Sequence, residues 1–267
     1  MELCLIEVPY MVGDDRHGAS AGPERVTHAL RTAAVKVERV ERGVPFRDSA
    51  SASAAVNARL AAIVRKAVAA GELPVAVAGS CDAALGVLAG VEHERCGVVW
   101  FDAHADFNTP ESTASGFFAG MSLAIVTGHC YRNLWAQIGD NARIREEATL
   151  LVGARDLSPA EERERLERSA IRVVQSDVAA ELDALAGRVE DVYVHVDLDA
   201  LDPEVAPGVV DEPVPGGLSL QELEDAVRAI AARFRIRAAA VTTYNPELDR
   251  DDMTLRAAVR IVERLAR

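Results

Sequence analysis

The sequence is short of basic residues and contains no long apolar run. Its 267 residues include 29 lysines and arginines against 42 aspartates and glutamates, which gives a formal net charge of −13. An acidic surface repels nucleic acids and anionic membranes, so we expect neither as a partner. No apolar run approaches the roughly 20 residues that a transmembrane helix needs. We therefore expect a protein that binds neither nucleic acid nor membrane.

Paired cysteines and a secretion signal are also missing. The four cysteines, Cys4, Cys81, Cys96 and Cys130, are scattered and form no CxxC pair. This spacing in a chain of this length is not typical of a disulfide scaffold. The first residues, MELCLIEVPYMVGDD, lack the basic region that opens a signal peptide. These absences predict a cytoplasmic protein.

Short β-rich segments alternate with alanine-rich helical segments along the chain. Residues 3–8, 74–79 and 97–104 are typical of buried strands, and residues 51–70 are typical of a helix. Apolar strands that alternate with helices indicate a parallel sheet covered on both faces. We therefore predict a three-layer α/β/α sandwich with a mainly parallel central sheet, formed as one domain over residues 1–267. A dinucleotide-binding protein is not favoured, because no GxGxxG follows the first strand.

Potential metal ligands follow two of the predicted strands. Asp102, His104 and Asp106 alternate in the run DAHAD, and Asp197 and Asp199 alternate in DLD. In extended backbone, residues two apart project to one side, and the carboxyl ends of parallel strands share one edge of the sheet. Carboxylates gathered there repel each other unless a cation lies among them. Oxygen-rich ligands with one imidazole favour Mn²⁺ or Mg²⁺, and two such ions would activate a water for hydrolysis.

His195 lies on the same face of the predicted strand as Asp197. It is either a further metal ligand or a hydrogen-bonding residue behind the ligands, and the sequence leaves this choice open. Aspartates at strand ends also cap helices or point into solvent. Two separate ligand sets, each preceded by an apolar run, favour the metal site.

Three segments together resemble the signature of the arginase family of ureohydrolases, which includes arginases, agmatinases and formiminoglutamases. They are DAHADFNTP at 102–110, HVDLDALDPEVAPG at 195–208 and PVPGGLS at 213–219. The resemblance covers essentially the whole chain. It implies a three-layer α/β fold, two Mn²⁺ ions and hydrolysis of a C–N bond in a small guanidino or amidino compound. Many members of the family are trimers or hexamers, so the resemblance also allows a homo-oligomer.

The resemblance assigns roles to the five predicted ligands. It implies that Asp102 and Asp197 bridge both ions, that His104 and Asp199 complete the shell of one ion, and that Asp106 binds the other. It also implies that Asp106 is catalytic, since this residue carries a proton from the bridging hydroxide to the leaving amine.

Cys81 is the first departure from the family pattern. The family has a metal-binding histidine in a Gly-Gly-Asp-His run, where this chain has Ala78-Gly79-Ser80-Cys81. Cys81 is either a thiolate ligand or a small buried residue at a helix start. As a ligand it would admit Co, Ni, Fe or Zn beside Mn²⁺.

The second departure concerns the loop after Asp106. Asn108, Thr113 and Ser115 match positions that bind the substrate carboxylate in arginases, although these residue types also form ordinary turns. Ala119 stands where arginases place a proton-shuttling histidine, and Phe117 makes the rim of the site more apolar.

The third departure is at the position that meets the guanidinium. Thr243 replaces a glutamate of arginases and agmatinases, and Ser158 replaces an acid that meets the substrate ammonium. A guanidinium in a closed pocket needs a carboxylate partner, so unmodified arginine is not the expected substrate. Glu111, Asp211 and Glu212 are candidates for a displaced carboxylate.

Two functions remain open from the sequence. The first is a hydrolase of a linear amidine or guanidine, with Thr243 among the substrate-binding residues. A modified arginine is favoured because Cys81 and the loop NTPESTASG resemble a branch with an Nω-hydroxyarginine hydrolase. The alternative is a catalytically impaired binding or scaffold protein with a depleted metal site. The changes at Cys81, Ala119 and Thr243 motivate it.

Overall fold

A computed structural model describes residues 2–11, 18–30, 35–41, 48–91, 96–139, 143–209 and 213–267. Within these ranges the strands form one eight-stranded sheet in the order β2-β1-β3-β8-β7-β4-β5-β6. Every neighbouring pair is parallel. The strands are β1 (Leu3–Val8), β2 (Lys36–Arg39), β3 (Leu73–Ala78), β4 (Cys96–Phe101), β5 (Thr149–Val152), β6 (Arg172–Val174), β7 (Asp191–Asp197) and β8 (Arg235–Thr242).

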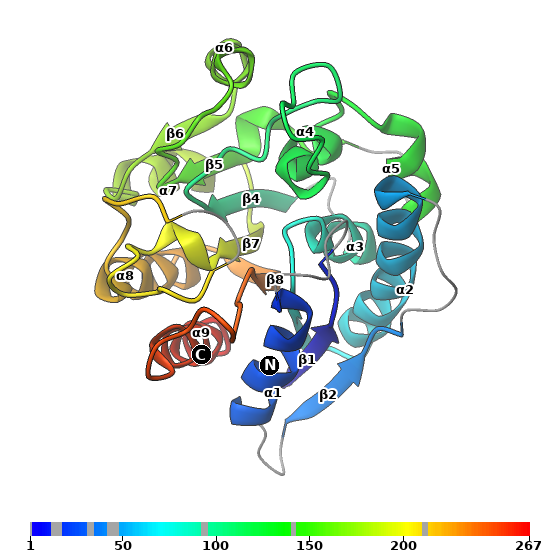
Figure 1. The fold of residues 1–267 in the computed structure, drawn as a ribbon, viewed down its shortest axis with the longest axis vertical. Coiled ribbons are helices and arrows are strands. Elements are labelled where there is room, and N and C mark those ends of the chain that lie inside the picture. The colour runs from blue at the N-terminus through cyan, green and yellow to red at the C-terminus, as the bar shows by residue number, and fades with distance from the viewer. Residues whose placement is uncertain are drawn as a thin grey trace.

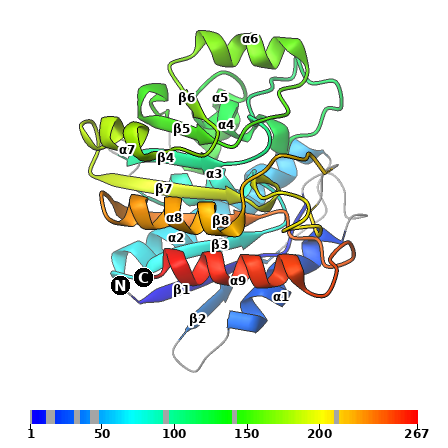
Figure 2. The same ribbon diagram turned by 90° about the vertical axis from the view of Figure 1, so that its left-hand side faces the viewer.

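Helices cover both faces of this sheet (Figures 1 and 2). One face packs against α2, α3, α4 and α5, and the other against α1, α7, α8 and α9. The predicted three-layer α/β/α sandwich is thereby confirmed. The helices are α1 (Gly22–Leu30), α2 (Ser49–Ala69), α3 (Ala83–Gly90), α4 (Ser122–Val126), α5 (Arg132–Ile138), α6 (Ala160–Arg168), α7 (Ala179–Ala186), α8 (Leu220–Ala231) and α9 (Met253–Leu265).

Strand β7 shows how the two cores divide the side chains. Val192, Val194 and Val196 face the core beneath α8 and α9. Tyr193 faces the opposite core, beneath α2 and α3. Because successive residues of a strand alternate between faces, His195 and Asp197 lie on the side of Tyr193. The apolar strand therefore delivers an imidazole and a carboxylate to the face that carries α3.

The prediction that DAHAD continues a strand is wrong. β4 ends at Phe101, and Asp106 has a positive φ of 49°. The cause is a turn in which Asp102 Oδ1 accepts a hydrogen bond from the backbone N–H of His104 at 2.8 Å. Aspartate competes in this way with the pairing of a strand. The same turn ends β7, where Asp197 Oδ1 accepts from the N–H of Asp199 at 2.8 Å.

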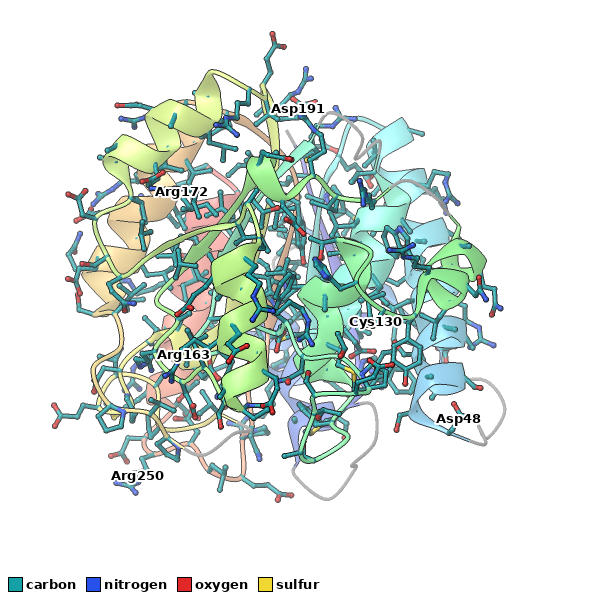
Figure 3. The ribbon with its side chains drawn as sticks, turned by 90° about the horizontal axis from the view of Figure 1, so that it is seen from above. Asp48, Cys130, Arg163, Arg172, Asp191 and Arg250 are labelled. Carbon is teal, nitrogen blue, oxygen red and sulfur yellow. The ribbon has the colours of Figure 1, made fainter. Side chains whose placement is uncertain are left out.

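Charged side chains such as those of Asp48, Arg163 and Arg250 are exposed to solvent (Figure 3). Among the described residues, no helix combines the length and apolar character needed to cross a membrane.

Gly79 allows two chain segments to approach each other at the end of β3. Its N–H donates to the carbonyl of Val8 at 3.3 Å. A Cβ atom at this position would overlap the carbonyl oxygen of Tyr10. The close approach fixes the path of the chain immediately before Cys81.

We predict that Gly79→Ala lowers the free energy of unfolding by about 1–3 kcal/mol, the usual cost of overpacking. Urea denaturation measures the loss. Gly187→Ala is the matched control, because a Cβ there makes only an ordinary contact at 3.5 Å with the carbonyl of Ala184. Equal stabilities of the two variants would contradict the prediction.

Candidate metal centre

The predicted ligands lie at the carboxyl ends of three strands, among four that are neighbours in the sheet. β3, β8, β7 and β4 lie side by side in the middle of the sheet. Cys81 follows β3, and Asp102, His104 and Asp106 follow β4. Asp197 ends β7, and Asp199 lies in the 3₁₀ turn Leu198–Ala200 directly after it. A parallel sheet places its ligand site at such an edge.

His104 joins the carboxylates of both strands. Its Nδ1 lies 3.3 Å from Asp102 Oδ1 and 3.0 Å from Asp199 Oδ2. Burial opposes a charge on this ring, but the hydrogen bonds to Asp102 and Asp199 prevail and raise the pKa of His104 well above its usual value. Asp199 also accepts the N–H of Ala103 at 2.9 Å. The carboxylate of Asp199 thus ties the end of β7 to the turn after β4.

Asp197 is the meeting point of two residues that depart from the family pattern. The Cys81 thiol donates to Asp197 Oδ2 over 2.8 Å, and the Thr243 hydroxyl donates to Oδ1. Burial, and then the charges of Asp199 and Asp102, raise the pKa of Asp197. Burial also raises the pKa of the Cys81 thiol, with Asp197 as the next cause. These two hydrogen bonds join the start of α3 and the end of β8 to the end of β7.

Asp106 has a carboxylate oxygen with no partner. Its Oδ2 is buried and makes no hydrogen bond to any part of the chain that the structure describes. Burial, followed by the charges of Asp102 and Asp197, raises the pKa of Asp106 well above its usual value. The backbone is held firmly, because the carbonyl of Asp106 accepts from the N–H groups of Leu123 and Ala124. The backbone that carries the free oxygen is therefore fixed, and the oxygen is available to a ligand.

This group of side chains fits divalent cations. Asp102, Asp106, Asp197 and Asp199 are each at most 8% exposed. Among the ion pairs of the described residues, only those of His104 reach these four carboxylates. Four buried carboxylates with one imidazole leave an excess of negative charge that bound cations would neutralise. The donors are mostly oxygens, which suits Mn²⁺ or Mg²⁺, and the sulfur of Cys81 extends the range to softer ions.

A small cavity of about 10 Å³ opens onto this group, which is room for a single water-sized sphere. Residues from six separate segments form its wall. They are Met11, Gly79, Ser80, Cys81, His104, Asp106, Phe117, Ala119, Asp197 and Thr243.

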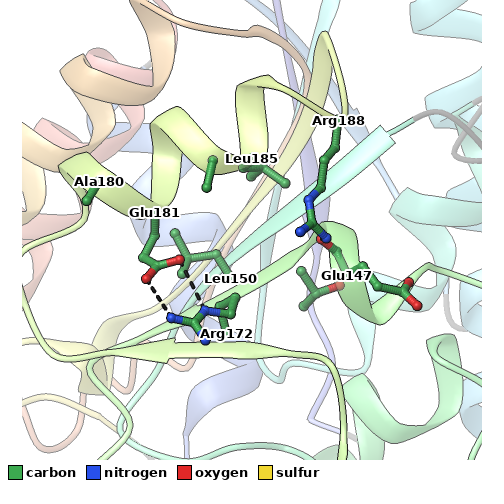
Figure 4. A pocket seen from close by; sticks show the side chains of 9 residues that line it. Glu147, Leu150, Arg172, Ala180, Glu181, Leu185 and Arg188 are labelled. Atoms are coloured by element: carbon green, nitrogen blue, oxygen red, sulfur yellow. Dashed lines mark hydrogen bonds and ion pairs between the residues drawn. The ribbon is translucent and has the colours of Figure 1, made fainter.

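A larger cavity of about 380 Å³ lies elsewhere, between β5, β6 and α7 (Figure 4). Its charged groups are already paired within the wall. Arg172 forms a two-pronged pair with Glu181 at 2.8 and 3.2 Å, and Arg188 donates to the carbonyl of Glu147 at 2.8 Å. The larger hollow is therefore a less suitable place for catalysis than the small cavity beside the carboxylates.

Sequence reasoning missed several residues that hold the ligands. Trp100 Nε1 donates to Asp102 Oδ2 at 3.0 Å, and its position two residues before Asp102 on the same strand face could have revealed it. Arg155 donates to the carbonyls of Asp199 at 2.8 Å and Val214 at 2.7 Å, and so ties β5 to the turn after β7. An arginine directly after a buried strand was the available signal.

Asp82 anchors the segment that carries Cys81. It is 3% exposed and accepts hydrogen bonds from the hydroxyls of Ser80 and Ser53. Ser53 lies on α2, and its Oγ is 2.6 Å from Asp82 Oδ2. Burial raises the pKa of Asp82, against the lowering effect of these hydroxyls. The partner on α2 lies 29 residues away in sequence, so no local pattern could have indicated it.

Glu162 supports the turn that carries Asp106. Its Oε1 accepts the backbone N–H of Phe107 at 2.9 Å, and the side chain is buried. Arg165, also on α6, donates to the carbonyl of the same Phe107 at 3.1 Å. Burial raises the pKa of Glu162 to about 7.

The predicted substrate residues are less closely grouped. Thr243 lines the cavity, but its hydroxyl is engaged with Asp197. The carboxamide of Asn108 bonds to Ser112 and to the carbonyl of Ser158. Thr113 and Ser115 accept backbone N–H groups within their own loop, at 3.1 Å each, and neither belongs to the cavity wall described above. Their role in binding a substrate stays a prediction.

Of the three candidates for a displaced carboxylate, only one can be placed. Glu111 is exposed in the loop after Asn108. Asp211 and Glu212 lie outside the described residues.

We predict that Thr243→Val weakens Mn²⁺ binding about 10- to 100-fold, because a residue that orients a metal ligand usually contributes that much. Valine keeps the branched shape at a positive φ of 70° and removes only the hydroxyl that Asp197 accepts. Thr243→Ser keeps the hydroxyl and serves as the control. Isothermal titration with Mn²⁺ measures both, and wild-type affinity in the valine variant would overturn the assignment.

A pH prediction follows from Glu162. Burial raises the pKa of Glu162 from 4.5 in the unfolded chain to about 7 in the folded protein. The protonated side chain therefore contributes stability below pH 4.5, and this contribution is lost as the pH rises through about 7. Relative to Glu162→Gln, the metal-free wild type should therefore lose about 1–3 kcal/mol between pH 5 and pH 8. Urea midpoints at both pH values measure this difference. Glu161→Gln, on the exposed side of α6, should retain the wild-type slope, and the same slope in Glu162→Gln would refute the prediction.

Comparisons with known proteins agree with this geometry. The arginase family model matches residues 1–266. Arginase from Bacillus caldovelox is 32% identical over 297 residues, which covers 97% of this chain and 96% of that protein. Its native crystal structure superposes with a TM-score of 0.90 at 31% identity, covering 100% of this chain and 98% of that one.

A further relative is named for a different activity. The N(omega)-hydroxy-L-arginine amidinohydrolase of Streptomyces lavendulae is 35% identical over 165 residues, which covers 60% of this chain and 56% of that protein. Taken with the whole-chain match and the shared fold, these findings show that the chain belongs to the arginase family and is a ureohydrolase-like hydrolase of C–N bonds in linear amidino or guanidino groups.

Proposed function

We propose that the chain binds two divalent cations, preferably Mn²⁺, and hydrolyses a C–N bond of a modified arginine beside them. The observation that best supports this is the burial of Asp102, Asp106, Asp197 and Asp199 around one histidine. Carboxylates at this density need cations as partners. When bound, the two ions lower the pKa of a shared water, which makes it a nucleophile near neutral pH.

The ligand atoms divide into two overlapping groups. Asp102, His104 and Asp199 offer atoms within 4.8 Å of one another, and so do Asp102, Cys81 and His195. Asp102 belongs to both groups and would contact both ions. Asp197 receives the thiol of Cys81 and the N–H of Asp199, so it also lies between the two groups. We assign Asp106 to the ion on the Cys81 side, as the family pattern implies.

Asp106 is the residue proposed to move the proton. Its free Oδ2 lies at the cavity wall, on a residue whose backbone is bonded to Leu123 and Ala124. Attack of the water on the amidine carbon releases a proton, which Asp106 accepts and then donates to the leaving nitrogen as the C–N bond breaks. The high pKa of the metal-free Asp106 results from burial beside other carboxylates, and cations would lower it to a range suited to this exchange.

The cavity wall favours a weakly basic substrate. Thr243, Phe117 and Ala119 provide no carboxylate for a cationic guanidinium. Hydroxylation of a guanidino nitrogen lowers its basicity, and an Nω-hydroxyarginine would then need no such partner. The named activity of the Streptomyces lavendulae relative supports this choice. We propose that Asn108, Thr113 and Ser115 bind the carboxylate of the substrate, and that the uncharged Thr243 faces its amidino end.

Substrate turnover tests the proposal. Protein loaded with Mn²⁺ or Co²⁺ is assayed with Nω-hydroxyarginine, arginine, agmatine and formiminoglutamate, and the released urea, hydroxyurea, amine or formamide is measured. We expect kcat/KM for Nω-hydroxyarginine to exceed that for arginine by about tenfold or more, which corresponds to about 1.4 kcal/mol. Asp106→Asn should reduce kcat by about 100-fold or more.

Elemental analysis of the same samples separates the two readings of the sequence. Two bound ions per chain with no turnover of any of these compounds would contradict the enzyme and favour a binding protein. Binding of no ion by the intact protein would contradict the metal centre itself.

A further inference from the structure

His195 is a buried imidazole that the proposed mechanism does not use. It lies on β7 beside Trp100 of β4 and Ala240 of β8, one layer deeper in the sheet than Asp197. Its exposed fraction is 0%, and its ring stacks on that of Trp100 at 3.7 Å with an angle of 18°. The ring is therefore held in one orientation.

The two ring nitrogens of His195 have different surroundings. Nδ1 lies 2.8 Å from the hydroxyl of the buried Tyr193. Nε2 is buried and has no hydrogen-bond partner anywhere in the described chain. Leaving a buried polar atom without a partner is unfavourable, so proteins seldom do it. Histidines that bind a metal commonly have one nitrogen on the ion and the other on an orienting group, which is the arrangement that Tyr193 provides.

Cys81 and Asp102 lie close to the imidazole of His195. A ring nitrogen of His195, the sulfur of Cys81 and a carboxylate oxygen of Asp102 are all within 4.8 Å of one another. Bonds of about 2.3 Å to sulfur and about 2.1 Å to nitrogen leave these atoms roughly 3.6 Å apart around a tetrahedral ion. Small side-chain movements would therefore allow all three to bind one cation.

We propose that His195 is a metal ligand that supplies, from β7, the imidazole that Cys81 replaces at the start of α3. The proposal rests on the metal centre of the proposed function and specifies the ion on the Cys81 side. This ion has sulfur, nitrogen and oxygen donors, whereas the ion on the His104 side has oxygens and one nitrogen. Borderline ions such as Co²⁺, Fe²⁺ or Zn²⁺ suit the first set, and Mn²⁺ suits the second. The two positions thus differ in metal preference.

Cobalt binding to the full chain tests the proposal without an activity assay. Equilibrium dialysis gives the number of Co²⁺ ions and their affinities, and optical absorption reports the bond from Cys81 sulfur to cobalt. We expect His195→Gln to lower the affinity for one of the two Co²⁺ ions by about 10-fold or more. We also expect it to diminish or shift the absorption of the sulfur-to-cobalt bond. His28→Gln is the control, since His28 is exposed on α1 and shares a surface hollow with Glu24 and Arg39, none of which is a proposed ligand.

Two more variants make the result decisive. Tyr193→Phe keeps the imidazole and removes its orienting hydroxyl, so a smaller loss of affinity for the same ion is expected. The double variant Cys81→Ser with His195→Gln should lose little more affinity for this ion than either single variant, because both residues bind the same ion. Thermal unfolding of the metal-free proteins checks that each variant folds.

The outcomes separate this inference from the proposed function. Two ions bound by wild type and by His195→Gln with equal affinity and the same sulfur absorption would overturn the role of His195 alone. No cobalt binding by the wild type would overturn the metal centre as well.

Discussion

The burial of four carboxylates at one edge of the sheet is the constraint on which the site depends. Asp102, Asp106, Asp197 and Asp199 come from two strands, and only His104 among the ion pairs of the described chain compensates them. The raised pKa values of Asp102, about 7, and of Asp106 and Asp197 follow from burial and mutual repulsion. Bound cations would relieve both effects. The same arrangement that destabilises the metal-free protein would thus, with cations bound, provide the proposed capacity to activate water.

The departures from the family pattern are physically connected. Cys81 and Thr243 stand at positions that carry a histidine and a glutamate in arginases, and both of their side chains donate to Asp197. A threonine that holds Asp197 supplies no charge for a guanidinium, which agrees with a less basic substrate. A cysteine that replaces a histidine leaves room for a different imidazole, and His195 lies within reach. These changes are more consistent with an altered enzyme than with a site that has decayed.

The fold was largely predictable because its signals are local. Apolar runs such as Leu3–Val8 became the expected strands, and the longest helix begins two residues before its predicted start at Ser51. Two short helices were not predicted. Helices α5 and α7 have only seven and eight residues, too few for a clear apolar period. Strand β4 was predicted to continue beyond Phe101, but the Asp102 side chain accepts the backbone N–H of His104 and ends the strand.

The sequence by itself determined the residue types of the site, since DAHAD and DLD each follow an apolar run that must be buried. It also determined which edge of the sheet they occupy, because parallel strands end together. Only the tertiary structure decided how these residues are held. Arg155 bonds to the backbone of Asp199, and Glu162 bonds to the backbone of Phe107 beside Asp106. The orientation of His195 depends on stacking between neighbouring strands. Such contacts join residues that are distant in sequence or depend on the packing of one strand against the next, so no periodicity records them.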